Sequence, residues 1–220
     1  MHKNNTQKGI LISFEGIDGS GKTTQINLLK RYLEEKGYEV LVTREPGGTR
    51  ISEKIRSVIL DPENTAMWEI TEMLLYASAR AQLVHEVIKP AIESGKIVIC
   101  DRFIDSSLAY QGYGRQISLD DIIKVNNIAL DGIMPSLTFF LDIPPEAALK
   151  RRLSSSQPDR IEQESLKFYN KVYEGYLSIV SAYPDRIKSI NADRDAESIF
   201  QEIKKWTEIL MDAHGNVGSK

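Results

Sequence analysis

Short apolar runs alternate with longer segments of helical periodicity along most of the chain. The apolar runs predict β-strands at residues 10–14, 39–43, 97–100, 137–141 and 186–190. Helices are predicted to begin near Lys22, Ser52, Trp68, Leu119, Pro145, Gln163 and Ala196. Strands that are separated by helices form βαβ crossovers, which make the strands parallel and cover both faces of the sheet. We therefore expect an α/β fold with a parallel five-stranded sheet flanked by helices.

The clearest helical periodicity covers residues 68–88. Apolar side chains recur there at helical spacing, namely Ile70, Met73, Leu74, Ala77, Ala81, Val84 and Ile88. Tyr76 and Arg80 fall outside this stripe and lie one turn apart on the same flank. An aromatic ring beside a forked donor can stack on a base and read its edge, or the two can form an intrahelical cation–π pair. The stripe itself fits either a core or a subunit interface.

The chain shows no internal repeat and no long linker, so we expect a single domain over residues 1–220 with tails at 1–8 and 213–220. Loops are predicted at residues 44–50, 101–114 and 154–159. The first two follow strands, at the sheet edge where parallel α/β folds bind ligands. Around the third, residues 151–161 are cationic and contain small polar residues and a proline. This segment is either a mobile lid or a solvated basic helix end.

Composition narrows the class of protein. The chain has 28 basic and 31 acidic residues without a long basic run, which argues against a nucleic-acid polymer or an anionic membrane as partner. The single cysteine, Cys100, cannot form an internal disulfide, which favours a reducing compartment. No apolar stretch reaches the length of a membrane span, and the polar start lacks the apolar core of a signal peptide. We expect a cytoplasmic protein.

The most informative motif lies between the first strand and the first helix. It matches G-x-x-x-x-G-K-[ST] in full and consists of Gly16, Ile17, Asp18, Gly19, Ser20, Gly21, Lys22 and Thr23. Backbone N–H groups of such a loop converge on phosphate oxygens at a helix N-terminus. Lys22 then lies near the β and γ phosphates, and the Thr23 hydroxyl can hold Mg²⁺. The motif predicts a nucleoside triphosphate site in a fold like that of P-loop NTPases.

Two further segments provide polar groups at the same sheet edge. Asp101 ends a buried apolar strand, where a carboxylate can hold Mg²⁺, and the adjacent Arg102 can grip a second phosphate. Asp142 is a rival metal ligand at the end of another strand. Arg44 precedes a Pro-Gly-Gly turn and either contacts an anionic ligand or is simply solvated.

The triphosphate site alone does not define the function, because GTPases, ATPases and small-molecule kinases share it. A GTP-dependent switch is disfavoured, since the chain has no Asn-Lys-x-Asp motif for reading guanine. Another nucleotide or nucleoside kinase, or an inactive relative, remains open at this point.

Six segments in this order resemble thymidylate kinases, the enzymes that convert dTMP and ATP into dTDP. They read FEGIDGSGKTT (14–24), TREPGGT (43–49), YASAR (76–80), DRF (101–103), AYQG (109–112) and DRIE (159–162). The resemblance implies that the loop at 16–23 binds ATP, with Arg151 beside the adenine, and that Mg²⁺ is the cofactor. It also implies in-line phosphoryl transfer in dTTP synthesis, and a homodimer.

The same resemblance implies roles in dTMP binding. Asp18 is expected at the sugar 3′-hydroxyl, Arg44 and Arg102 at the phosphate, and Tyr110 against the sugar 2′ position. The Tyr76 ring is expected to stack on thymine, where most relatives have Phe. The remaining residues expected around the base are Arg80, which donates to thymine O4, together with Ser106, Ser107 and Gln111.

Two departures from the family pattern affect these expectations. Relatives without an arginine at the position of Gly19 usually carry arginines in the middle of the lid, but here that stretch, residues 153–157, has none. Arg152 or Arg160 is then expected to stabilise the transferred phosphate, together with Lys22, Arg102 and the Mg²⁺ that Asp101 is expected to hold. Phe103 also stands where relatives more commonly have Tyr or His.

Overall fold

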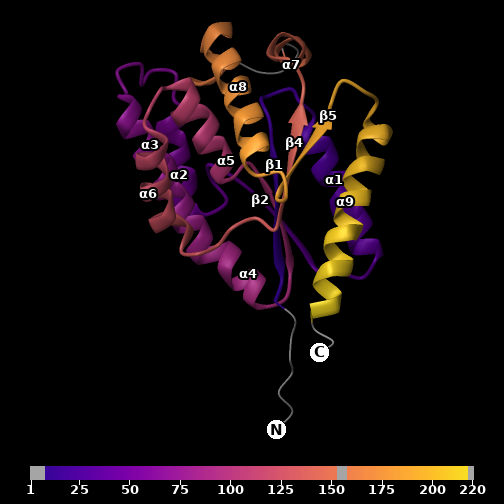
Figure 1. The fold of residues 1–220 in the computed structure, drawn as a ribbon. Coiled ribbons are helices and arrows are strands. Elements are labelled where there is room, and N and C mark those ends of the chain that lie inside the picture. Colours follow the sequence, from indigo (N-terminus) through magenta and orange to yellow (C-terminus); the bar gives the residue numbers. More distant parts are fainter. Residues whose placement is uncertain (1–7, 153–157, 218–220) are drawn as a thin grey trace.

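The structure is a computed structural model that describes residues 8–152 and 158–217. Its centre is a parallel sheet with the strand order β2-β3-β1-β4-β5 (Figure 1). The strands are β1 (Ile10–Glu15), β2 (Val40–Arg44), β3 (Ile97–Asp101), β4 (Leu137–Asp142) and β5 (Ile187–Asn191). Each lies within about one residue of the predicted strand, so the expected five-stranded parallel sheet is confirmed.

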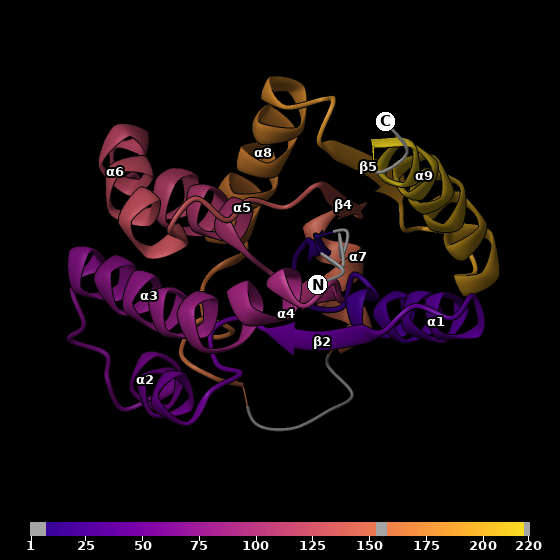
Figure 2. The same ribbon diagram turned by 90° about the horizontal axis from the view of Figure 1, so that it is seen from below.

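Helices cover both faces of the sheet, as the crossover rule predicts. Figures 1 and 2 show α1 and α9 on one face, and α3, α4, α5, α6 and α8 on the other. The helices are α1 (Lys22–Glu35), α2 (Arg50–Leu60), α3 (Glu69–Leu83), α4 (Lys89–Glu93), α5 (Ile104–Ser107), α6 (Leu119–Leu130), α7 (Pro145–Arg152), α8 (Leu166–Ala182) and α9 (Ala196–Val217). Two π-helical segments, η1 (Val84–Ile88) and η2 (Leu108–Gly114), continue α3 and α5.

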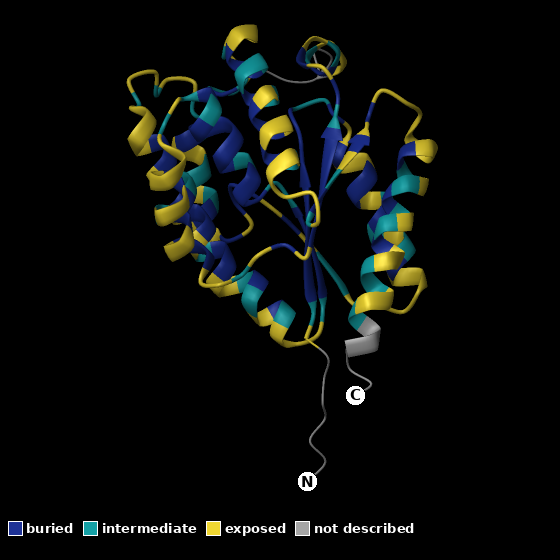
Figure 3. Ribbon diagram, in the orientation of Figure 1, coloured by how far each residue is buried: buried dark blue, intermediate teal, exposed yellow. Residues whose placement is uncertain are grey.

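Burial follows the sheet (Figure 3). Every residue of β1 is buried, and Ile12 and Phe14 are completely inaccessible. Because β1 pairs with β3 on one side and β4 on the other, it occupies the centre of the core. The phosphate-loop motif therefore follows the central, fully buried strand of the sheet. In the described part of the chain, none of the helices has the length and apolar character needed to span a membrane.

The predicted loop at residues 101–114 is wrong, because α5 and η2 occupy most of it. Gly112 and Gly114 lower the intrinsic helix propensity of this stretch. They are accommodated because packing needs small residues here. A Cβ at Gly112 would lie 2.5 Å from Leu119 at the start of α6, and Gly114 lies where η2 crosses α8. A Cβ at Gly114 would lie 2.7 Å from the Phe168 ring, and one at Gly175 would lie 2.7 Å from Tyr113. Close helix packing outweighs local propensity here.

The apolar stripe predicted for residues 68–88 is divided between two environments. Met73, Ala77, Val84 and Ile88 are buried, whereas Ile70 and Leu74 are 49% and 46% exposed. Arg80 on the neighbouring flank is only 1% exposed. The face of α3 that points inward is thus rotated from the apolar stripe toward Tyr76 and Arg80. Helix α6 packs against α3 and also exposes apolar side chains, among them Ile123 and Ile128.

Candidate active site

Two neighbouring pockets lie at the carboxyl ends of β1, β2 and β3, where the sequence predicts ligand binding. The inner pocket is lined by Asp18, Glu45, Pro46, Arg56, Leu60, Tyr76, Arg80, Arg102, Ser106, Ser107, Tyr110, Gln111, Asp159, Ile161 and Glu162. The loop pocket is lined by Asp18, Gly19, Gly21, Lys22, Thr23, Thr24, Arg44, Glu45, Arg56, Asp101, Arg102 and Arg151. The residues common to both are Asp18, Glu45, Arg56 and Arg102. The two pockets therefore form one continuous cleft with two arginines and two carboxylates at the junction.

The loop pocket is built around the start of α1. Its N-cap, Gly21, adopts a left-handed backbone with φ of 96° and has no side chain to cap the helix. The first N–H groups of a helix lack intrahelical acceptors, so this end favours an anion. The Lys22 ammonium donates to the carbonyls of Gly16 (3.0 Å) and Ile17 (3.2 Å). Burial and the charge of Arg102 lower the pKa of Lys22, and a bound polyphosphate would oppose that shift.

Gly19 lies directly against helix α7. A Cβ at this position would lie 2.1 Å from the carbonyl oxygen of Ala148, and the backbone φ is +87°. Both facts exclude a larger residue unless α7 moves. The close approach gives a structural reason for glycine where some relatives have arginine.

The residues expected to hold Mg²⁺ fit that role. Asp101 and Thr23 line the same pocket, and the buried Oδ1 of Asp101 has no hydrogen-bond partner in the described part of the chain. The rival Asp142 lines neither pocket and accepts hydrogen bonds from Tyr173 (2.7 Å) and Ser189 (3.4 Å). An unpartnered carboxylate oxygen beside a phosphate loop suits a hard cation.

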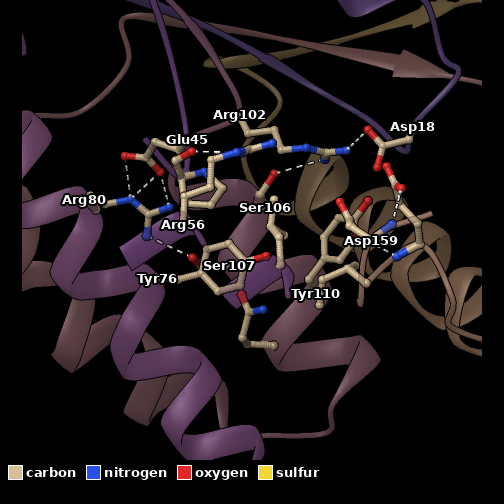
Figure 4. Close-up of a pocket in the computed structure, with 15 residues that line it drawn as sticks. Asp18, Glu45, Arg56, Tyr76, Arg80, Arg102, Ser106, Ser107, Tyr110 and Asp159 are labelled. Carbon is tan, nitrogen blue, oxygen red and sulfur yellow. Dashed lines mark hydrogen bonds and ion pairs between the residues drawn. The ribbon is translucent and has the colours of Figure 1, made fainter. Parts of the chain in front are cut away.

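Arg102 stands at the junction of the pockets in a strained backbone conformation, with φ of +68°. Its guanidinium donates to the Gly16 carbonyl (2.7 Å) and the Asp18 carboxylate (2.9 Å) and lies 5.1 Å from the centre of the Tyr110 ring (Figure 4). Left-handed backbone at a large residue is costly and is found mainly at functional sites. The strain turns this side chain from the end of β3 across the phosphate loop.

The inner pocket combines an aromatic wall with small polar groups. Tyr76 from α3 and Tyr110 from η2 line it together with Ser106, Ser107 and Gln111 (Figure 4). The buried hydroxyl of Tyr110 has no partner among the described residues. Burial raises the pKa of Tyr76 and Tyr110, so both are neutral hydroxyls at ordinary pH. Such a pocket suits a flat, partly polar ring system.

Arg80 lines the inner pocket, but its donors are engaged by the protein. The guanidinium lies over the Phe103 ring, 5.4 Å from its centre, rather than forming the alternative pair with Tyr76. Its acceptors are Glu45 (2.8 Å), Ser107 (2.9 Å), the Phe103 carbonyl (3.0 Å) and Asn126. The expected contact of Arg80 with a base therefore requires sharing one of these donors with the ligand.

Two arginines on β2 and α2 differ in their placement. Arg44 lines the loop pocket only, is about half exposed and pairs with Glu53 (2.9 Å). Arg56 lines both pockets and donates to the Pro46 carbonyl (2.9 Å). Sequence reasoning missed Arg56, although its position on the helix that follows the predicted loop at 44–50 was a usable signal.

The arginines of the predicted lid segment, residues 151–161, lie in different environments. Arg151 lines the loop pocket and donates to Ala192 (2.9 Å) and Asp193 (2.7 Å). Arg160 lines neither pocket and donates to Ile59 (2.8 Å) and Glu72 (2.8 Å). The side chain of Arg152 and all of residues 153–157 lie outside the described residues. In this conformation Arg160 is held apart from the cleft.

The sheet order, the phosphate loop after the central strand and the two-pocket cleft define a P-loop NTPase fold. The family model for thymidylate kinase matches residues 14–203, and the chain belongs to the thymidylate kinase family.

Individual relatives agree with this assignment. A thymidylate kinase of Clostridium novyi (strain NT) is 50% identical over 90% of this chain and 97% of its own length. One of Geobacillus sp. (strain WCH70) is 52% identical over 88% of this chain and 93% of its own length. The crystal structure of thymidylate kinase from Ehrlichia chaffeensis, 33% identical, superimposes with a TM-score of 0.76 and covers 91% of this chain and 99% of that one.

Proposed function

We propose that the protein transfers the γ-phosphoryl group of ATP to dTMP, yielding dTDP, with Mg²⁺ as cofactor. The observation that carries this proposal is the junction of two pockets at Asp18, Glu45, Arg56 and Arg102. Phosphoryl transfer needs two anionic substrates aligned end to end and cations where negative charge accumulates. Family membership selects dTMP as the acceptor.

The loop pocket is proposed as the ATP site. Backbone N–H groups of residues 16–23 and the Lys22 ammonium bind the phosphates, and Arg151 lies beside the adenine. Thr23 and Asp101 would hold Mg²⁺, which neutralises phosphate charge when it is bound. No nucleophilic side chain is required, since the attacking oxygen belongs to the acceptor phosphate.

The inner pocket is proposed as the dTMP site. Arg102 binds the acceptor phosphate, with Arg44 and Arg56 contributing charge from the β2–α2 side, and Asp18 accepts from the 3′-hydroxyl. Tyr76 stacks on thymine, and Arg80, Ser106, Ser107 and Gln111 surround its polar edge. Tyr110 excludes a 2′-hydroxyl. All of these residues line one of the two pockets, which supports the assignment.

Lid closure is proposed to complete the site. Arg152 or Arg160 then stabilises the transferred group, and Arg160 must first exchange its contacts with Glu72 and Ile59 for the phosphates. Burial opposes ionisation of Glu72, but Arg115 outweighs it and the net pKa is lowered, so Glu72 remains a charged partner.

A cytoplasmic homodimer is part of the proposal. Apolar side chains are exposed on α3 and α6, which pack side by side, and they include Ile70, Leu74, Ile123 and Ile128. Ile128 is 84% exposed, which is unusual for a large aliphatic side chain unless another surface covers it.

The test is a coupled assay with ATP, Mg²⁺ and a panel of monophosphates. We expect dTMP to exceed dUMP by about 10–200-fold in kcat/KM, because a methyl group changes only apolar contact. UMP, dCMP and thymidine should be poor acceptors. Rapid hydrolysis without any acceptor would instead favour a nucleotide switch, and equal rates with dCMP would contradict the role of Arg80.

A further inference from the structure

Glu15, the last residue of β1, is a buried carboxylate that no step of the proposed reaction uses. It is completely inaccessible, so it cannot touch either substrate. It nevertheless lies between the phosphate loop, which begins at the next residue, and the turn that carries Arg102. Burying a carboxylate is costly unless hydrogen bonds satisfy it.

Each oxygen of Glu15 is hydrogen-bonded to the structure around Arg102. Oε1 accepts from the backbone N–H of Phe103 at 2.8 Å, directly after the left-handed residue Arg102. Oε2 accepts from the hydroxyls of Ser106 at 2.5 Å and Tyr176 at 2.9 Å. Both hydroxyl oxygens in turn lie 3.5 Å from the Arg102 guanidinium.

We propose that Glu15 is a positioning residue for the acceptor phosphate, because it fixes the turn and the two hydroxyls that direct Arg102 into the cleft. This inference rests on the proposed role of Arg102 in dTMP binding. Three donors converge on one carboxylate from the turn after β3, from α5 and from α8, so one side chain aligns three elements on one side of the inner pocket. Loss of that alignment would weaken the binding of dTMP more than the binding of ATP, because the ATP phosphates are proposed to bind to the loop backbone.

Only the ionised carboxylate accepts all of these hydrogen bonds. Burial raises the pKa of Glu15 to about 7, and the charge of Asp105 adds to the effect. The other charged or titratable groups that act on it, besides Tyr176, are Lys22, Cys100, Arg102, Tyr110 and Arg186. Protonation of Glu15 near pH 7 would therefore turn one acceptor oxygen into a donor. The hydrogen bonds that fix the turn and the two hydroxyls beside Arg102 would then be weakened.

The test is steady-state kinetics of Glu15→Gln with dTMP or ATP as the varied substrate. Gln keeps the size of the side chain but replaces one acceptor oxygen by an amide donor. We expect the dTMP KM to rise at least about 10-fold at pH 8, while the ATP KM changes less than about twofold. The ratio of kcat/KM for dTMP between wild type and Glu15→Gln should decrease from pH 8 toward pH 6. Titration of the substrate phosphate affects both proteins equally and does not change this ratio.

A second pair of variants keeps the test decisive if Glu15→Gln does not fold. Tyr176→Phe removes one donor to Glu15 and retains the ring, which stacks on Phe140 at 4.9 Å. Tyr173→Phe is the control: it removes a hydroxyl on the same helix, but that hydroxyl donates to Asp142 and not to Glu15. Only Tyr176→Phe should raise the dTMP KM, by about 3-fold or more.

The inference is overturned if Tyr176→Phe and Tyr173→Phe behave alike, or if a folded Glu15→Gln protein changes the dTMP and ATP KM values equally or leaves both unchanged. Wild-type protein that does not phosphorylate dTMP would overturn the proposed function and this inference together. Normal wild-type turnover with unaffected variants would overturn this inference alone.

Discussion

At the scale of single residues, Arg102 combines a backbone conformation that costs free energy with a guanidinium placed at the junction of the two pockets. A non-glycine residue with positive φ costs on the order of 1–3 kcal/mol. In the described structure its guanidinium is balanced by Asp18 at 2.9 Å, which is only partly buried. A phosphate that enters the inner pocket would meet a preformed, charged donor at the junction of the two sites.

Replacement of Arg102 by alanine should therefore damage acceptor binding selectively. We expect kcat/KM for dTMP to fall by about 100-fold or more, which is the scale of losing a charge-assisted contact in a closed site. The KM for ATP should change little. Initial rates with dTMP as the varied substrate measure the effect, and wild-type kinetics in this variant would remove Arg102 from the acceptor site.

Glu15 also makes a prediction about stability. Its pKa in the folded protein is raised from 4.5 to about 7, so the folded state holds this proton more tightly than the unfolded state. Protonation of Glu15 therefore stabilises the folded state. This contribution is fully present below pH 4.5 and is lost as the pH rises through 7. Each pKa unit corresponds to about 1.4 kcal/mol, so the full loss is on the order of 3 kcal/mol.

Glu15→Gln lacks this titration. The free energy of unfolding of Glu15→Gln relative to wild type should rise between pH 5 and pH 8 by that amount, even though dTMP binding is weakened at pH 8. Urea denaturation across this pH range measures the difference. A difference that stays constant with pH would show that Glu15 has an ordinary pKa.

At the scale of elements, the sequence predicts the features that depend on residues close together in the chain. Apolar runs locate the strands, and the phosphate-loop motif locates its pocket, because both depend on neighbouring residues. The helical segment at 104–114 is missed because its glycines serve packing against other helices, Gly112 against α6 and Gly114 against α8, which lies far along the chain. The burial of Arg80 is missed for the same reason, since its acceptors Glu45 and Asn126 come from distant segments. Motifs predicted many of the residues that line the two pockets, but Arg56 and the hydrogen-bond network around Glu15 required the fold.

The contact between the phosphate loop and α7 makes a testable prediction at this scale. Gly19→Ala introduces a Cβ 2.1 Å from the Ala148 carbonyl at a φ of +87°. Gly37→Ala is a matched control, because its φ is +88° and nothing lies within 4 Å. Both variants should lose about 1 kcal/mol of stability from the backbone.

Only Gly19→Ala should also displace α7. We expect the free energy of unfolding of Gly19→Ala to be lower than that of Gly37→Ala by roughly a further 1–2 kcal/mol, and its KM for ATP to be higher. Thermal unfolding and ATP titrations measure both effects. Equal stability and equal ATP KM in the two variants would mean that α7 does not lie against the loop in solution.

At the scale of the whole molecule, the proposed dimer interface is the surface formed by α3 and α6. Leu74 on α3 is 46% exposed, and Ile209 on α9, on the opposite side of the sheet, is 49% exposed. Because Leu74 and Ile209 are similarly exposed but lie on opposite sides of the sheet, the same substitution at each gives a matched pair of variants.

Sedimentation velocity tests the proposed dimer. The wild-type protein should sediment at twice the chain mass of 24.9 kDa. Leu74→Glu should shift it to the monomer because it places a charge in the interface, and Ile209→Glu should not. A wild-type monomer, or equal behaviour of the two variants, would exclude this surface as the interface.

Calorimetric titration with dTMP and a non-hydrolysable ATP analogue, in the presence of Mg²⁺, tests most directly whether one cleft holds two nucleotides. We predict that each ligand binds once per chain and that neither prevents the other from binding. Arg102→Ala should weaken dTMP binding alone, and Lys22→Ala should weaken binding of the ATP analogue alone. Competition between the two ligands for a single site would contradict the two-pocket arrangement.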